Sequence, residues 1–251
     1  DEYIVHVNST MAQVLSERGW VVETFMPRNA EEVLKRFLDG VVIMVAPEDI
    51  GIPEETLRLF PSIRFNWPGD KNVHGVVSDH VESGYLGARE LLEAGHRRIA
   101  VITCPRPHWA VCDRLEGVRR AFAEYDAVFN ENLLFVADNE SLPAAIDSAI
   151  EASATALFAL GEVPTPMAVS RILGKWRLRI PEDISVIGFQ LREQAQHYCP
   201  PLTGIRQPIE QMAQKVGELL DVCSRNSEAP PMTLVFGNEL VKGGSVAPPR
   251  G

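Results

Sequence analysis

Residues 76–103 read VVSDHVESGYLGARELLEAGHRRIAVIT, and this stretch decides the fold class. Apolar residues recur in it at helical spacing, at Val81, Tyr85, Ala88, Leu91 and Leu92. Such a stripe predicts an amphipathic helix with one buried face. Gly95 then stands where a left-handed residue ends a helix, with the basic residues 96–98 near the negative end of the helix dipole. The apolar run 99–102 predicts a strand buried on both faces, so the stretch forms half of a parallel βαβ layer.

Strands and helices alternate along the rest of the chain, which predicts α/β architecture with doubly wound parallel sheets. Helices are expected at residues 1–18, 30–37, 53–59, 113–125, 142–151, 165–175 and 209–222. Strands are expected at residues 20–25, 40–46, 63–67, 133–136, 156–160 and 184–187, with a strand pair in 232–244 around Gly237 and Asn238. Residues 200–208 are expected to form a connector, and Thr165 to cap its helix ahead of Pro166.

The composition is that of a soluble globular protein. The chain has 251 residues, of which 45% are hydrophobic and 23% are charged. Its 24 Lys+Arg against 34 Asp+Glu give a formal net charge of −10, and such a chain is a poor DNA-binding module because it repels phosphates. No apolar run is long enough to span a bilayer, and no secretory signal opens the sequence. The 4 cysteines lack the spacing of a zinc site or disulfide framework, which favours a reducing cytoplasm.

Several motifs resemble the LacI/GalR family of bacterial transcriptional repressors, and they stand in family order and spacing. They are GHRRIA at 95–100, DRLEG at 113–117, PEDISVIGF at 181–189, PLT at 201–203 with QP at 207–208, and ELV at 239–241 with Ser245, together with Asp79, Gly84 and Ala88. The resemblance implies a two-lobed, periplasmic-binding-protein-like (type I) effector domain with a small-molecule pocket between the lobes. It places residues 1–77 with 207–231 in the N-terminal lobe, and residues 78–206 with 232–251 in the C-terminal lobe.

The family also implies partners. They are a small-molecule effector (sugar-like or another polar metabolite), a second copy of the chain in a homodimer, and operator DNA. The DNA is bound through a helix-turn-helix headpiece and hinge, and residues 1–30 show no recognition helix with basic flanks. No cofactor, metal or membrane contact is expected. We expect a headpiece that this chain does not contain.

Two other functional classes compete with this interpretation. A periplasmic solute-binding protein of a transporter shares the fold, but the unpaired cysteines and the motifs at 95–100 and 181–189 favour the regulator. An enzyme is not expected, because the sequence lacks GxSxG, HExxH and P-loop patterns.

Arg114 stands at the family's arginine position, one turn into a helix at the mouth of the cleft. The resemblance implies that its planar guanidinium donates two hydrogen bonds to ligand hydroxyls or carboxylates. The alternative role for Arg114 is an ion pair on the protein surface. Tyr3 matches a family aromatic that stacks on a flat ligand face. Trp67 and Trp109 follow strands and are candidates to line the cleft, with core or rim packing as their alternative.

The chain departs from the family at two cleft positions. Glu162 and Val163 stand where the family has Asn-Asp, and Gln190 and Leu191 replace Asp-Asp after residues 188–189. Gln190 and Glu162 are therefore candidate ligand residues. An amide adds an NH2 donor where a carboxylate only accepts, so a ligand rich in acceptors is expected rather than a plain hexose. Gly188 is expected to let the backbone turn out at the carboxyl end of its strand, where such sheets bind ligands.

Overall fold

The computed structural model of the protein describes residues 2–44, 52–67, 69, 72–104, 109–161, 163–189, 197–226 and 229–250. The helices are α1 (Glu2–Glu17), α2 (Ala30–Leu34), α3 (Glu54–Leu57), α4 (His80–Glu93), α5 (Trp109–Glu124), the 3-10 helix η2 (Glu131–Leu133), α6 (Leu142–Glu151), α7 (Pro164–Gly174) and α8 (Ile209–Arg225). The strands are β1 (Val41–Ile43), β2 (Ser62–Phe65), β3 (His74–Ser78), β4 (Ile99–Thr103), β5 (Leu134–Val136), β6 (Ala156–Ala159), β7 (Ser185–Phe189), β8 (Thr203–Arg206), β9 (Thr233–Phe236) and β10 (Glu239–Val241).

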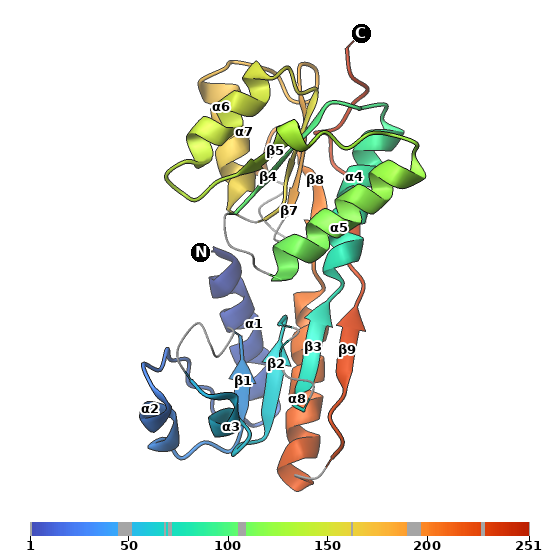
Figure 1. The fold of residues 1–251 in the computed structure, drawn as a ribbon. Coiled ribbons are helices and arrows are strands. Elements are labelled where there is room, and N and C mark those ends of the chain that lie inside the picture. Colours follow the sequence, from blue (N-terminus) through green and yellow to red (C-terminus); the bar gives the residue numbers. More distant parts are fainter. Residues whose placement is uncertain are drawn as a thin grey trace. The chain divides into compact units, whose positions relative to one another are not determined.

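These elements divide between two compact units, each built on its own sheet (Figure 1). Unit 1 consists of Asp1–Tyr3, His80–Gln207 and Asn238–Gly251, and unit 2 of Ile4–Asp79 and Pro208–Gly237. The chain therefore passes between the units more than once.

Unit 1 holds a six-stranded sheet in the order β10-β8-β7-β6-β4-β5, parallel except for β10 against β8. Alternate residues of each strand face opposite sides. Ile99 and Val101 of β4 pack with buried residues of α4 and α5, whereas Ile102 packs with those of α6 and α7. The sheet is thus covered by helices on both faces, which explains why its central strands are apolar throughout.

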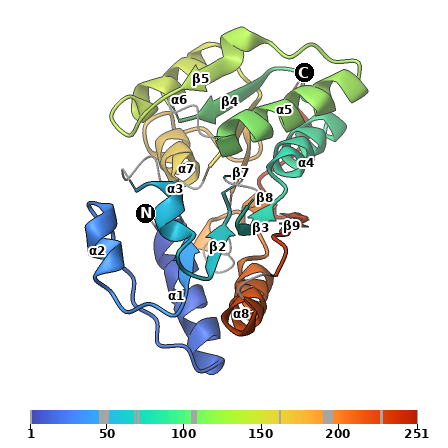
Figure 2. The ribbon, with the colours of Figure 1, turned by 60° about the horizontal axis from the view of Figure 1, so that its bottom comes forward.

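Helices α4 and α5 pack unusually closely, and they lie side by side in both views (Figures 1 and 2). A Cβ atom added at Gly84 would lie 1.8 Å from the carbonyl oxygen of Arg114. One added at Gly117 would lie 1.9 Å from the carbonyl oxygen of Val81. Both glycines therefore permit backbone-to-backbone contact that any side chain would block, and they fix where Arg114 sits.

The histidine of the GHRRIA motif, His96, has a structural role. It is 1% exposed, and its Nδ1 lies 2.9 Å from Thr155 Oγ1 while its Nε2 lies 2.9 Å from the carbonyl oxygen of Ala247. Nε2 also lies 3.0 Å from Ser185 Oγ. Burial lowers the pKa of His96, so the neutral ring joins the C-terminal segment to the amino ends of β6 and β7.

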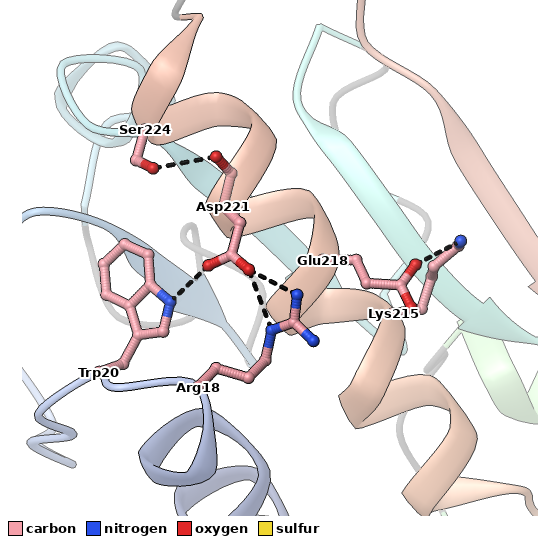
Figure 3. Close-up of polar contacts among 6 residues, drawn as sticks. All are labelled: Arg18, Trp20, Lys215, Glu218, Asp221 and Ser224. Carbon is pink, nitrogen blue, oxygen red and sulfur yellow. Dashed lines mark hydrogen bonds and ion pairs between the residues drawn. The ribbon is translucent and has the colours of Figure 1, made fainter.

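Unit 2 holds a four-stranded, all-parallel sheet in the order β1-β2-β3-β9. Figure 3 shows how Asp221 of α8 joins this helix to the end of α1. Its carboxylate accepts from Trp20 Nε1 at 2.9 Å and from Arg18 Nε at 3.1 Å. Arg18 lies across Gly217, where a Cβ would approach its Cδ to 2.5 Å, so the glycine gives the arginine its path to Asp221.

We expect Asp221→Asn to lower the free energy of unfolding by about 1 kcal/mol at pH 7, because the charged acceptor of two donors is lost. Trp20 and Arg18 hold the pKa of Asp221 below its ordinary value. A lowered folded-state pKa gives stability that is complete above the unfolded value and is lost as the pH falls through the folded value. The difference between the two proteins should therefore shrink below about pH 4.

Urea unfolding at several pH values measures this effect. The matched control is Glu218→Gln on the same helix. The exposed carboxylate of Glu218 forms a local ion pair with Lys215, three residues earlier in α8 (Figure 3). That change should have little effect. Equal losses in the two variants would contradict the role assigned to Asp221.

The predicted α/β class with parallel sheets is confirmed, but several local predictions are wrong. Residues 20–25 form no strand and pair with none of the strands of the described unit 2 sheet. Residues 203–206 form strand β8 rather than a connector. The residues around Gly237 do not form a strand pair, since β9 joins β3 in unit 2 and β10 joins β8 in unit 1.

Three further details differ. Val163, not Thr165, is the N-cap of α7, and Thr165 instead donates from its hydroxyl to the carbonyl oxygen of Gly161 at 2.8 Å. Gly188 lies inside β7, where its missing side chain makes room for Thr165. The observed units also differ from the expected lobe boundaries, because residues 232–237 pair with β3 and so lie in unit 2.

Candidate functional site

Arg114 lies on α5 at the carboxyl edge of the unit 1 sheet. It is 6% exposed, its Nη1 donates to the carbonyl oxygen of Leu160 at 3.0 Å, and its Cζ lies 3.8 Å from the centroid of the Phe189 ring. A guanidinium so deeply buried and stacked on an aromatic face is held in one orientation. The surface ion pair, its alternative in the sequence, does not describe this environment.

The strand register shows which residues surround Arg114. Ile102 pairs with Ala159 and Phe158 with Ile187, so one residue further along Thr103, Leu160 and Phe189 form a row across the sheet. Leu160 and Phe189 belong to the cluster under α4 and α5. Thr103 follows Ile99 and Val101 in alternation, so its side chain lies on the same face. Arg114 therefore lies over the end of a row in which Thr103 is the polar member.

Thr103 was not predicted as a site residue. It is 1% exposed, and its Oγ1 has no hydrogen-bond partner in the described part of the chain. The available sequence signal was a hydroxyl at the end of an otherwise apolar strand. Thr103 stands out because its side chain is buried and its hydroxyl has no hydrogen-bond partner in the described chain. Neither property can be inferred from a sequence pattern.

Three of the predicted site residues have no described side-chain environment. Glu162 and Gln190 lie outside the described residues. Trp109 is the first residue of α5, and only its backbone position is described. Trp109 thus begins the helix that carries Arg114, and the ligand roles of all three stay predictions.

Tyr3 lies in the first turn of α1 and belongs to unit 1. Its hydroxyl donates to Oε1 of Gln207 at 3.0 Å, and Gln207 is 7% exposed. This hydrogen bond fixes the orientation of the Tyr3 ring. It also ties the start of α1 to Gln207, the last residue of the unit 1 segment His80–Gln207. Whether the ring stacks on a ligand stays a prediction.

Trp67 lies in unit 2, just beyond the carboxyl end of β2, and is 6% exposed. Its carbonyl oxygen accepts from Nη1 of Arg64 at 2.8 Å, and its ring lies 5.9 Å from the guanidinium carbon. Arg64 is fully buried and also donates from Nη2 to Thr233 Oγ1 at 3.0 Å. Arg64, which the sequence did not single out, thus joins Trp67 to β9, and the ligand role of Trp67 stays a prediction.

The described residues contain no group of three or more His, Cys, Asp or Glu placed to hold a metal ion. None of the helices in those described residues is long and apolar enough to cross a membrane. All four cysteines are free: Cys104, Cys112 and Cys199 are exposed, and Cys223 is buried with its pKa raised by burial.

Comparison with known proteins gives consistent matches. A family model described as a periplasmic binding protein-like domain matches residues 88–246. The chain is 32% identical over 196 residues to the HTH-type transcriptional repressor PurR of Aliivibrio fischeri (strain MJ11). This alignment covers 73% of this chain and 57% of the repressor. The chain thus spans little more than half the length of the curated relatives it matches.

Solved structures share the fold. A complex of the transcriptional regulator CelR with cellobiose aligns with a TM-score of 0.83 and 26% identity, covering 96% of this chain and 78% of that chain. A LacI family transcriptional regulator from Enterococcus faecium with bound ribose aligns with a TM-score of 0.86 and 24% identity, covering 100% and 96%. The second likeness shows the fold alone.

Proposed function

Because the chain belongs to the periplasmic-binding-protein-like family, as an effector-binding domain of the LacI/GalR type, we propose that it senses a small polar metabolite for a transcriptional regulator. The observation that carries this proposal is the buried Arg114, held over the carboxyl edge of a parallel sheet. Doubly wound sheets bind ligands outside the carboxyl ends of their strands. The relatives are transcriptional regulators, which favours this function over a transporter's solute-binding protein and over an enzyme.

In the whole protein, we propose that this domain controls an N-terminal helix-turn-helix that binds operator DNA. The ligand acts by population shift, since it stabilises whichever state of the domain binds it more tightly. A ligand with a 100-fold preference changes the equilibrium by about 2.7 kcal/mol, which is enough to switch operator occupancy. The charge of −10 fits a sensor domain that does not itself contact phosphates.

The chemistry of the ligand follows from the donors at the site. Arg114 presents a planar fork for oxygen acceptors, and Tyr3 and Trp109 are the proposed apolar walls. A relative that is 26% identical has been solved with cellobiose, which supports a sugar-like or similarly polar ligand. The proposed ligand residue Gln190 adds an NH2 donor, which favours a ligand richer in acceptors than a hexose, whereas Glu162 keeps a carboxylate that can accept from the ligand.

A thermal-shift screen of sugars, sugar phosphates, sugar acids, nucleobases and small acids tests the function. A binder at 100 times its Kd stabilises the folded state by about 2.7 kcal/mol, which gives a rise of several degrees in Tm. We expect at least one class to give a saturable rise. A chain that no compound stabilises at millimolar concentration would contradict the proposal.

We also propose that the domain is a cytoplasmic homodimer. Its unpaired thiols suit a reducing compartment. Val163, Met167 and Leu173 on and next to α7 are 42%, 39% and 43% exposed, an apolar surface that a second copy would cover. Light scattering should give twice the monomer mass, and Met167→Glu with Leu173→Glu should weaken the dimer at least tenfold, as expected for buried apolar contacts.

The control for the dimer is Val128→Glu, because Val128 is an exposed apolar residue of unit 1 outside α7 (86% exposed). It should leave the mass unchanged. A wild-type chain that stays monomeric at all concentrations would overturn the dimer.

A further inference from the structure

The hydroxyl of Thr103 is an unusual atom in this fold. Thr103 is the one described Ser or Thr whose hydroxyl is shielded from solvent and has no hydrogen-bond partner in the described chain. Other buried hydroxyls of unit 1 are paired: Thr165 donates to Gly161 at 2.8 Å, and Thr203 accepts from the Gly243 amide at 3.0 Å. A buried polar group left unpaired is costly, so such a group calls for a partner outside the chain.

The position of Thr103 indicates where that partner binds. Thr103 ends β4, the strand next to β6 in the interior of the sheet, and its side chain shares a face and a cross-sheet row with Leu160 and Phe189. Both of those residues contact the Arg114 guanidinium. The hydroxyl and the guanidinium therefore belong to the same corner of unit 1.

The start of α5 adds backbone donors to this corner. Helix α5 follows β4, so it begins at the carboxyl edge of the sheet, and its first turn has no acidic residue. The amino end of a helix carries a partial positive charge and unpaired amides. A buried cation, a hydroxyl without a partner in the described chain and the amino end of α5 together favour a negatively charged oxygen group.

We propose that Thr103 Oγ1 and Arg114 form a donor pair that binds an anionic oxygen group of the effector, the carboxylate of a sugar acid or the phosphate of a sugar phosphate. The hydroxyl donates to one oxygen and the guanidinium to another, so the group is recognised by geometry as well as charge. This inference rests on the proposed function and names the class of ligand for that site. Thr103 is then a specificity-determining residue.

Calorimetric titration of the chain with paired probes tests the ligand class. The pairs are ribose with ribose 5-phosphate, and glucose with gluconate, so that each neutral sugar is compared with a phosphate or a carboxylate. We expect at least one anion to bind about tenfold or more tightly than its neutral partner. The pair that shows the difference identifies which anion the site takes.

Substitutions test the residue. Thr103→Val removes the hydroxyl at equal volume and should weaken binding of that anion about tenfold, the effect of one hydrogen bond to a charged group. Its Tm should not fall, because no hydrogen-bond partner among the described residues is lost. Thr103→Ser should retain affinity within about threefold, since the donor is kept. The matched control, Thr203→Val, removes a paired hydroxyl from a strand of the same sheet and should lower Tm without changing affinity.

The outcomes separate this inference from the function. If neutral sugars or nucleobases bind but no anion binds more tightly, the proposed function stands and the inference is wrong. Thr103→Val binding the anion as tightly as the wild type would also overturn it, as would a fall in Tm as large as that of Thr203→Val. A chain that binds no member of the wider screen contradicts the proposed function as well.

Discussion

Gly84→Ala is expected to destabilise the domain by about 3 kcal/mol, the upper part of the range for overpacking. The added methyl group would lie 1.8 Å from the carbonyl oxygen of Arg114. A backbone atom has no rotamer with which to move aside, so α5 must shift as a whole. Alanine has a higher helix propensity than glycine by about 1 kcal/mol, which favours the variant. The predicted loss of about 3 kcal/mol in the free energy of unfolding is the net effect after this gain.

Denaturant unfolding measures the loss, and Gly174→Ala is the matched control. Gly174 ends α7, and a methyl group added there would meet nothing within 4 Å, so alanine should be neutral or stabilising by up to about 1 kcal/mol. Gly117→Ala should behave like Gly84→Ala, because its methyl group meets the Val81 carbonyl oxygen at 1.9 Å. A Gly84→Ala protein as stable as the wild type would contradict the close packing of α4 on α5.

Arg114→Ala is expected to weaken ligand binding by about 1.5–3 kcal/mol, roughly 10- to 150-fold, through loss of a charge-assisted hydrogen bond. Arg114→Lys should recover only part of this, because an ammonium group cannot bond to two acceptors in one plane. Calorimetry with the best compound of the screen gives both affinities. Far-UV circular dichroism and Tm show whether the variants remain folded.

Arg119→Ala is the control for Arg114. Arg119 lies on the same helix but its side chain is 44% exposed and pairs with Glu131 at 3.0 Å. Its removal should leave affinity unchanged and stability nearly so. If Arg114→Ala binds as tightly as Arg119→Ala, the assignment of Arg114 to the ligand is wrong.

The sequence predicts best where the signal is local. The helix and strand within residues 76–103 appear as α4 and β4, because apolar spacing and a helix stop are both written in consecutive residues. Gly95 has φ of 97°, the left-handed conformation predicted for it. The resemblance then gave the family and directed attention to Arg114, whose burial and stacking come only from the structure.

Non-local pairing explains the errors. Residues 233–236 and 239–241 look like a strand pair because glycine and asparagine separate them, yet their partners are β3 and β8, far away in the chain. The missed strand β8 contains threonine and glycine after two prolines, a composition typical of a loop. Thr103 was missed for a related reason, since an unpaired hydroxyl is recognised only once all its neighbours are known.

The central claim is that this domain couples a small ligand to DNA binding, and one measurement tests it most directly. Genomic fragments are selected with the full-length protein, and its affinity for the selected DNA is then measured by fluorescence anisotropy with and without the ligand of the screen. We predict sequence-specific binding whose Kd changes at least tenfold on saturation with ligand, about 1.4 kcal/mol of coupling or more. DNA affinity that is non-specific, or that stays the same at saturating ligand, would contradict the account.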